Sequence, residues 1–135
     1  MINRALNYVN FFKEFHKHAS PRCANYGSLD GTPHGQAASI ESLISFSNAV
    51  LNRFPNGQIT VLDAGAGATT AFLCNEQRFD VISCDPDAEY LAEVIDVVTR
   101  MGLKPPTPVT IGQVIGEGAL KFDACFYDYG CAERQ

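Results

Sequence analysis

Short apolar runs alternate with longer amphipathic segments along most of the chain. Runs rich in branched and aromatic side chains are typical of strands buried on both faces of a sheet, and segments in which apolar residues recur every three or four positions indicate helices. Strands are expected at 59–63, 81–84, 109–111 and 122–127. Helices are expected at 39–54, near 69–77 and at 88–101. This alternation predicts an α/β fold with a parallel sheet of about four strands flanked by helices.

Residues 1–38 do not continue the alternation of strands and helices. Residues 2–18 carry an apolar stripe at helical spacing and predict an N-terminal helix. Residues 20–38 are rich in glycine, proline, serine and asparagine and predict a linker. We therefore divide the chain into an N-terminal helical extension at 1–38, which acts as a lid or a packing element, and an α/β domain at 39–135.

Composition narrows the class of protein. With 135 residues, 46% of them hydrophobic and 19% charged, the chain has the size and balance of one globular domain. The net charge is −5, and no basic cluster is longer than two residues. Nucleic-acid binding requires grouped lysines and arginines to neutralise phosphates, so the sequence carries no nucleic-acid signature.

Cysteine usage and hydropathy indicate the compartment. The five cysteines form no Cys-x-x-Cys pair, and Cys74, Cys84 and Cys125 lie within apolar segments. We expect buried, reduced thiols and a cytoplasmic protein. No apolar run reaches 18 residues and the N-terminus lacks a signal-peptide core, so no membrane partner is expected. No metal site is expected either, because His16 and His18 would point to different faces of a helix.

The candidate chemistry begins where the first strand ends. The run Ile59–Leu62 leads into Asp63, and Gly65 and Gly67 follow with one residue between them, which indicates the strand, tight turn and helix start of a nucleotide-binding loop. A phosphate-binding P-loop would need a lysine after the glycines, and none is present. A dinucleotide site would need a third glycine or an alanine where Thr70 stands, and Asp63 would oppose the charge of a pyrophosphate.

A ligand with a cationic amine and no phosphate suits Asp63 better, because a carboxylate attracts the amine and the glycines let the backbone approach closely. Asp85 ends the second strand 20 residues after Gly65, the separation at which an acid meets ribose hydroxyls in this class of fold. Asp85 could instead cap the next helix, although Asp87 is better placed for that role. The two acids and the turn therefore suit a nucleoside with an amino-acid-like tail.

The segment Asp63-Ala64-Gly65-Ala66-Gly67 resembles the first motif of class I S-adenosylmethionine-dependent methyltransferases, which have a Rossmann-like fold. The segment 81–85 is similar to their second strand with its terminal acid, and 122–128 is similar to their fourth strand. The resemblance covers roughly residues 36–130 and implies S-adenosylmethionine as the cofactor.

The resemblance also implies roles for individual residues. Gly65 and Gly67 would face the methionine portion of the cofactor. Asp63 would lie near its amine, and Asp85 would bind the ribose. Gln113, after the third strand, would lie near the adenine. The expected cofactor-binding set is Asp63, Ala64, Gly65, Gly67, Asp85 and Gln113.

The chain departs from the family after the fourth strand. Members of the family continue with a fifth strand and an antiparallel hairpin, whereas this chain ends at Gln135. We expect a domain that is incomplete at its C-terminus, with strand order third, second, first, fourth and an open edge at the fourth. Three outcomes stay open: a fragment of a longer protein, an edge covered by another chain in a homo-oligomer, or an edge shielded by the N-terminal helix and the tail.

Catalysis and function follow from these expectations. Methyl transfer needs donor and acceptor in line and often a base, and Asp128, flanked by Tyr127 and Tyr129, is the catalytic candidate. We expect a methyltransferase that acts on a small-molecule acceptor. One alternative is a cofactor-binding or interaction module without turnover. The other is a nicotinamide-dependent oxidoreductase, which Asp63 and Thr70 both disfavour.

Overall fold

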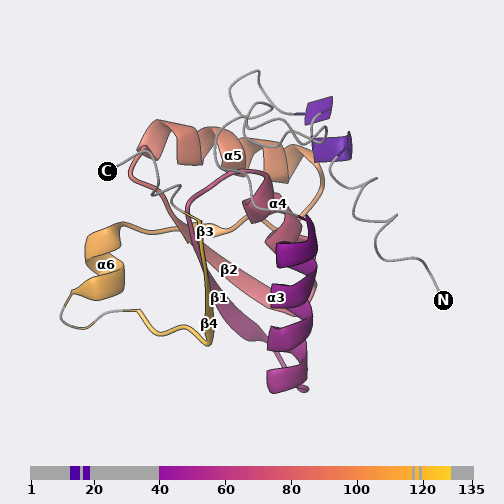
Figure 1. Cartoon of the computed structure of the whole chain (residues 1–135). Coiled ribbons are helices and arrows are strands. Elements are labelled where there is room, and N and C mark those ends of the chain that lie inside the picture. The colour runs from indigo at the N-terminus through magenta and orange to yellow at the C-terminus, as the bar shows by residue number, and fades with distance from the viewer. Residues whose placement is uncertain (1–12, 16, 19–39, 117, 119, 129–135) are drawn as a thin grey trace.

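The computed structural model describes residues 13–15, 17–18, 40–116, 118 and 120–128 (Figure 1). Residues 13–15 and 17–18 are helical, as the predicted N-terminal helix requires. The rest of that helix and the predicted linker at 20–38 lie outside the described residues.

The sheet forms the centre of the described part. Its strands are β1 (Ile59–Ala64), β2 (Phe79–Cys84), β3 (Thr107–Pro108) and β4 (Ala124–Tyr127). They lie in the order β3-β2-β1-β4, and every pairing is parallel (Figure 1). The α/β fold and the expected strand order are confirmed. Because the strands are parallel, their carboxyl ends share one edge of the sheet, and Asp63, Asp85 and Asp128 all lie at that edge.

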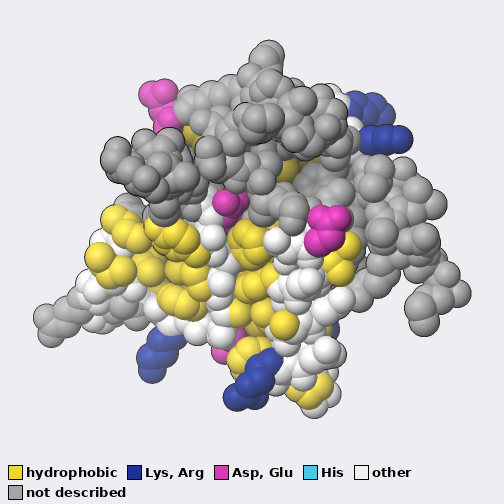
Figure 2. All heavy atoms as spheres, in the orientation of Figure 1, with side chains coloured by type: hydrophobic (Ala, Val, Ile, Leu, Met, Phe, Trp, Pro, Cys, Tyr) yellow, Lys and Arg dark blue, Asp and Glu magenta, His cyan; other side chains and the backbone are white. Residues whose placement is uncertain are grey.

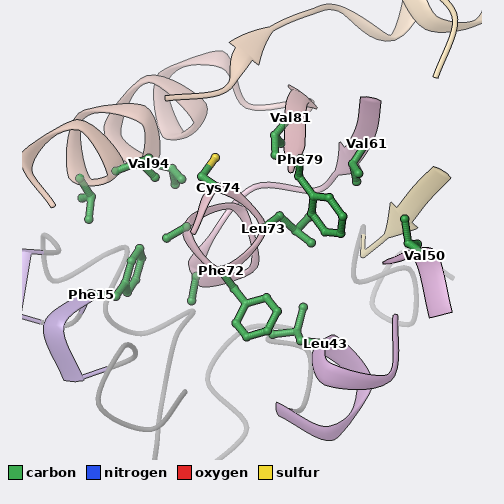
Figure 3. Packing of buried hydrophobic residues seen from close by; sticks show 14 of the residues in the cluster. Phe15, Leu43, Val50, Val61, Phe72, Leu73, Cys74, Phe79, Val81 and Val94 are labelled. Carbon is green, nitrogen blue, oxygen red and sulfur yellow. The ribbon is translucent and has the colours of Figure 1, made fainter. Parts of the chain in front are cut away.

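One face of the sheet carries the main hydrophobic core. The helices α3 (Ile40–Arg53), α4 (Ala68–Cys74) and α5 (Ala88–Arg100) supply most of its helical side chains. In Figure 3 α4 lies at the centre of this core, with Phe72 pointing toward Leu43 of α3 and Leu73 toward Phe79 of β2. All seven side chains of α4 are buried, so this short helix is stabilised by packing rather than by its own length. None of the helices in the described part has the length and apolarity to cross a membrane.

The opposite face carries a smaller cluster. Leu62, Ala64 and Cys84 are buried there, and Val114 of α6 (Ile111–Ile115) packs against them. Around this cluster the structure exposes large apolar side chains, and Figure 2 shows apolar side chains gathered over α6 and over the strands. The exposed set is Ile111, Ile115, Leu120, Phe122 and Tyr127.

The third strand differs from the prediction. The sequence predicts a strand at 109–111, but β3 is Thr107–Pro108 and Ile111 begins α6. Thr110 Oγ1 accepts a hydrogen bond from Gln113 N (3.2 Å), and Gln113 Oε1 accepts one from Thr110 N (2.8 Å). The prediction is wrong because this Thr-x-x-Gln capping box starts a helix, which outweighs the β propensity of the branched residues around it.

The fourth strand lies at the end of the strand order, as expected, but its two faces differ. Phe126 packs on the main core, and its ring meets that of Phe46 edge-on at 5.1 Å between centroids. Cys125 is exposed, so the prediction of a buried thiol is wrong here, whereas Cys74 and Cys84 are buried as predicted. The reason is the alternation of β4: Cys125 pairs with Leu62, on the face that carries the smaller cluster.

Candidate functional site

The glycine turn joins β1 to α4 at the carboxyl edge of the sheet. Gly65 has a φ of 107°, a conformation that side-chain-bearing residues rarely adopt, so glycine is required there. The three N–H groups of the turn all donate within the protein: Gly65 to Cys84 O (2.9 Å), Ala66 to Asp85 Oδ2 (2.9 Å) and Gly67 to Thr70 Oγ1 (3.0 Å). A phosphate bound at the turn would have to displace these bonds. The N–H groups of Gly65, Ala66 and Gly67 therefore stabilise the turn itself.

Asp85 fastens the turn to the end of β2. While Oδ2 accepts from Ala66, Oδ1 accepts from Asp87 N at 2.8 Å. Asp87 is the N-cap of α5, and its side chain accepts from Tyr90 N at 3.0 Å, so the alternative role of Asp85 as that cap is excluded. The Asp85 carboxylate stays half-buried, and each of its oxygens keeps a second acceptor position for a ligand.

Asp63 has an environment that the sequence did not reveal. Its side chain is fully buried, and Oδ2 accepts from the hydroxyls of Thr70 (2.6 Å) and Ser83 (2.8 Å). Among the described residues Oδ1 has no hydrogen-bond partner. Asp63 therefore lies beneath the turn and exposes no surface to a ligand in this structure, and the group it holds directly is the hydroxyl of Thr70.

The burial of Asp63 changes its acidity. The pKa of this carboxyl is raised to about 7, mainly by burial; the hydrogen bonds from Thr70 and Ser83 oppose the rise, and the charges of Asp128 and Asp85 add to it. Neutral and ionised Asp63 are therefore both populated at neutral pH. Perturbed carboxyls of this kind cluster at functional sites.

A cavity of about 550 Å³ opens between the start of α5 and the segment that leads into α6. Both Asp85 and Gln113 line it, so the structure brings together the two residues assigned to the ribose and the adenine. A volume of this size suits a ligand of the dimensions of a nucleoside. The rest of the lining is Pro86, Ala88, Leu91, Ala92, Ile95, Pro108, Val109, Thr110 and Ile111.

Gln113 has a structural role as well as a place in the cavity. Its Oε1 closes the capping box with Thr110 N at 2.8 Å. The same bond fixes the orientation of the amide, and within the described part of the chain Nε2 is left as a donor. Gln113 can thus cap α6 and donate to a ligand at the same time.

Asp128 directly follows β4, which lies next to β1 on the side away from β2. Its N–H donates to Ala64 O at 2.7 Å, which places it against the end of β1. Burial raises the pKa of the half-buried Asp128 carboxyl, and a hydrogen bond from the Thr69 side chain opposes that shift. Asp128 lies with the turn and with Asp63 rather than in the cavity lining, as do Ala64, Gly65 and Gly67.

Two hydroxyl residues of the site were missed by sequence reasoning. In the sequence Thr70 stands out only as the residue in place of a third glycine, and Ser83 only as part of a strand. The signal for Ser83 is register: it pairs with Asp63 across β1 and β2. The signal for Thr70 is its position in the first turn of α4, directly after the glycines.

Comparisons with family models, with curated proteins and with solved structures find no match to this chain. The function is therefore inferred from the residues and their geometry. In the described residues no group of three or more histidine, cysteine, aspartate or glutamate side chains is arranged to hold a metal ion.

Proposed function

We propose that the protein is an S-adenosylmethionine-dependent methyltransferase that acts on a small-molecule acceptor. The observation that carries the proposal is the cavity at the carboxyl edge, lined by Asp85 and Gln113 and adjoining a glycine turn whose amides are all occupied. The strand order β3-β2-β1-β4 supports it, because β1 and β4 lie side by side at the point where ligands bind in open parallel sheets.

The residues present fit the adenosine portion of this cofactor. The cavity offers a mainly apolar wall for a base, with Gln113 Nε2 as a donor toward its ring nitrogens. The remaining acceptor positions of the Asp85 carboxylate suit the two ribose hydroxyls, which are donors. A nicotinamide dinucleotide fits less well, since the Asp63 carboxyl group lies beneath the turn to which its pyrophosphate would bind, and Thr70 stands where such a site has a third glycine.

When bound, the cofactor supplies a sulfonium methyl group whose carbon–sulfur bond breaks as the acceptor forms a new bond to carbon, leaving a neutral thioether. This chain would contribute the base that takes the proton of an oxygen or nitrogen acceptor. Asp128 is our candidate for that base, because burial raises its pKa toward the pH at which a carboxylate is an effective proton acceptor.

Substitution Asp128→Asn tests that role. We expect it to lower the rate of methyl transfer by about 100-fold, since loss of a general base typically costs that much or more, while binding of S-adenosylhomocysteine stays within about twofold of wild type. Asp123→Asn is the matched control, because Asp123 lies at the opposite end of the same strand, where its Oδ2 accepts from Thr60 N. The measurement is transfer of labelled methyl groups to a panel of small-molecule acceptors. Equal rates for both variants would remove Asp128 from catalysis.

The second candidate function is a cofactor-binding interaction module without turnover. The exposed apolar side chains of α6 and β4 favour it, together with the place of β4 at the end of the strand order in the described part of the chain. Cofactor binding with no methylated product from any acceptor would favour this candidate. Sedimentation equilibrium would then show whether two copies associate and whether Ile115→Asp, at an exposed position of α6, separates them.

A further inference from the structure

The Gln113 side chain is held in the cavity wall by the residue that starts α6. Its Oε1 accepts from Thr110 N at 2.8 Å and from the Thr110 hydroxyl at 3.4 Å. The hydroxyl accepts in turn from Gln113 N at 3.2 Å, which completes the capping box. Thr110 and Gln113 both line the cavity, so the capping box is part of its wall.

These bonds determine which way round the Gln113 amide lies. A backbone N–H is only a donor, so the amide atom that faces Thr110 N must be the oxygen and not the nitrogen. A carbonyl oxygen has two lone pairs, and the two donors of Thr110 occupy both. The Gln113 side chain therefore offers a ligand the N–H donors of Nε2 and no acceptor. Gln113 is exposed as well as lining the cavity, so a ligand there can reach this group.

This arrangement excludes the usual way in which glutamine recognises adenine. Glutamine commonly forms two bonds to the base, in which Nε2 donates to N7 and Oε1 accepts from the 6-amino group. The second bond would require Oε1 to leave Thr110 and would open the capping box of a five-residue helix that has no buried side chain. Gln113 therefore recognises a base in this cavity through a donor alone.

Among the ring nitrogens of adenine, N3 suits a lone donor best. N1 and N7 both lie beside the 6-amino group, whose N–H bonds would face those of the amide. N3 has no N–H neighbour, and it lies on the edge of the base that is next to the ribose. Asp85, the residue proposed to hold the ribose, lines the same cavity as Gln113.

We propose that Gln113 determines the specificity for the base by donating from Nε2 to N3, and that Thr110 is the positioning residue that holds the amide in this orientation. Gln113 thus recognises the ring nitrogen and takes no part in recognising the group at position 6. This inference rests on the proposed function, because it takes the ligand to be an adenosine derivative.

Isothermal titration with three thioethers tests the proposal. They are S-adenosylhomocysteine, its 3-deaza analogue, in which a C–H group replaces N3, and its inosine analogue, in which an oxygen replaces the 6-amino group. The wild type should bind the 3-deaza analogue about fivefold more weakly than S-adenosylhomocysteine, which is the usual effect of one neutral hydrogen bond. Gln113→Met has a side chain of similar length without an N–H group and should bind these two ligands equally. The ratio of affinities for the adenosine and inosine ligands should be the same in wild type and variant.

Gln113→Glu separates the two roles of the side chain. One carboxylate oxygen can accept from Thr110 N and keep the capping box, but the other presents an acceptor where glutamine presents a donor. This variant should therefore bind the 3-deaza analogue more tightly than S-adenosylhomocysteine, the reverse of the wild-type order. Amide hydrogen exchange in the free protein checks the capping box, since protection of the Thr110 N–H should persist in Gln113→Glu and fall in Gln113→Met.

The Thr110 hydroxyl has its own pair of variants. Thr110→Val removes the group that donates to Oε1 and caps α6, so the difference between S-adenosylhomocysteine and its 3-deaza analogue should shrink. Thr110→Ser keeps the hydroxyl and should restore the difference. A difference that is the same in Thr110→Val as in the wild type would remove Thr110 from the positioning of the amide.

The outcomes distinguish this inference from the proposed function. Equal binding of S-adenosylhomocysteine and its 3-deaza analogue by the wild type would overturn the inference, as would a difference that persists in Gln113→Met. A ratio of adenosine to inosine ligand that changes in Gln113→Met would also overturn it, because the amide would then recognise position 6. In each of these cases S-adenosylhomocysteine still binds and the proposed function stands. If the folded wild type binds none of the three ligands, the proposed function is overturned, and the base specificity with it.

Discussion

Asp63→Asn is expected to abolish most of the pH dependence of stability between pH 4 and pH 7. In the folded protein the pKa of Asp63 is raised to about 7, whereas an unfolded chain gives an aspartate a pKa of about 3.9. The folded state therefore keeps a proton that the unfolded state has lost, so the free energy of unfolding falls as pH rises through this window. Between pH 4 and pH 7 the titration of Asp63 lowers the free energy of unfolding by about 4 kcal/mol in total.

Urea unfolding of wild type and variant at several pH values measures this effect. The asparagine keeps an oxygen that can accept from Thr70 and Ser83 but cannot ionise, so the variant should show only the smaller slope that Asp128 contributes in the same direction. Asp96→Asn is the control, because Asp96 is an exposed member of an ion pair with Arg100 on α5 and should leave the wild-type slope in place. If the free energy of unfolding depends on pH in the same way in wild type and in Asp63→Asn, Asp63 does not have the raised pKa described above.

Leu73→Ala is expected to lower the free energy of unfolding by about 3 kcal/mol, the usual cost of removing a buried leucine side chain and leaving a cavity. Leu73 has no exposed surface and points toward Phe79 from α4, at the centre of the main core (Figure 3). A loss of this size would also disturb the turn, because α4 begins directly after Gly67.

Ile115→Ala is the matched control for Leu73→Ala. Ile115 is also a helical aliphatic residue, but 75% of its surface is exposed, and a change there should cost less than about 0.5 kcal/mol. The measurement is the denaturation midpoint in urea with an unchanged slope. Similar losses for the two variants would mean that α4 does not occupy the core as described.

The sheet was predictable because its signals are long and repeated. The apolar runs of β1, β2 and β4 each predict a buried strand, and the amphipathic segments between them predict the helices on the covered face. The N-cap role of Asp87 was also predictable, because an aspartate directly before the first residue of a helix is a local signal. The sequence pattern misplaces the short third strand, because its two residues carry little signal and the capping box of Thr110 and Gln113 starts a helix just after it.

The sequence was enough to predict which residues gather at the site, but not that Asp63 is buried. The positions of Asp85 and Gln113 at one cavity follow from strand order, since both come after strands that lie side by side in the sheet. The burial of Asp63 does not follow from order alone. It depends on the β1–β2 register, which places Ser83 beside it, and on the start of α4, which places Thr70 above it. An acid before two glycines reads the same in sequence whether it faces the ligand or the core.

The most direct test of the proposed function is a titration of the protein with S-adenosylhomocysteine, followed by calorimetry and by amide NMR. We expect binding, resonance shifts confined to the turn and to the cavity residues around Asp85 and Gln113, and a loss of affinity of about tenfold or more in Asp85→Asn, the usual effect of removing a charged hydrogen-bond acceptor. The Asp96→Asn variant should bind as the wild type does. If the folded wild-type protein shows no binding at millimolar ligand, the proposed function is contradicted. It is also contradicted if the shifts fall on the exposed apolar residues of α6 and β4 instead.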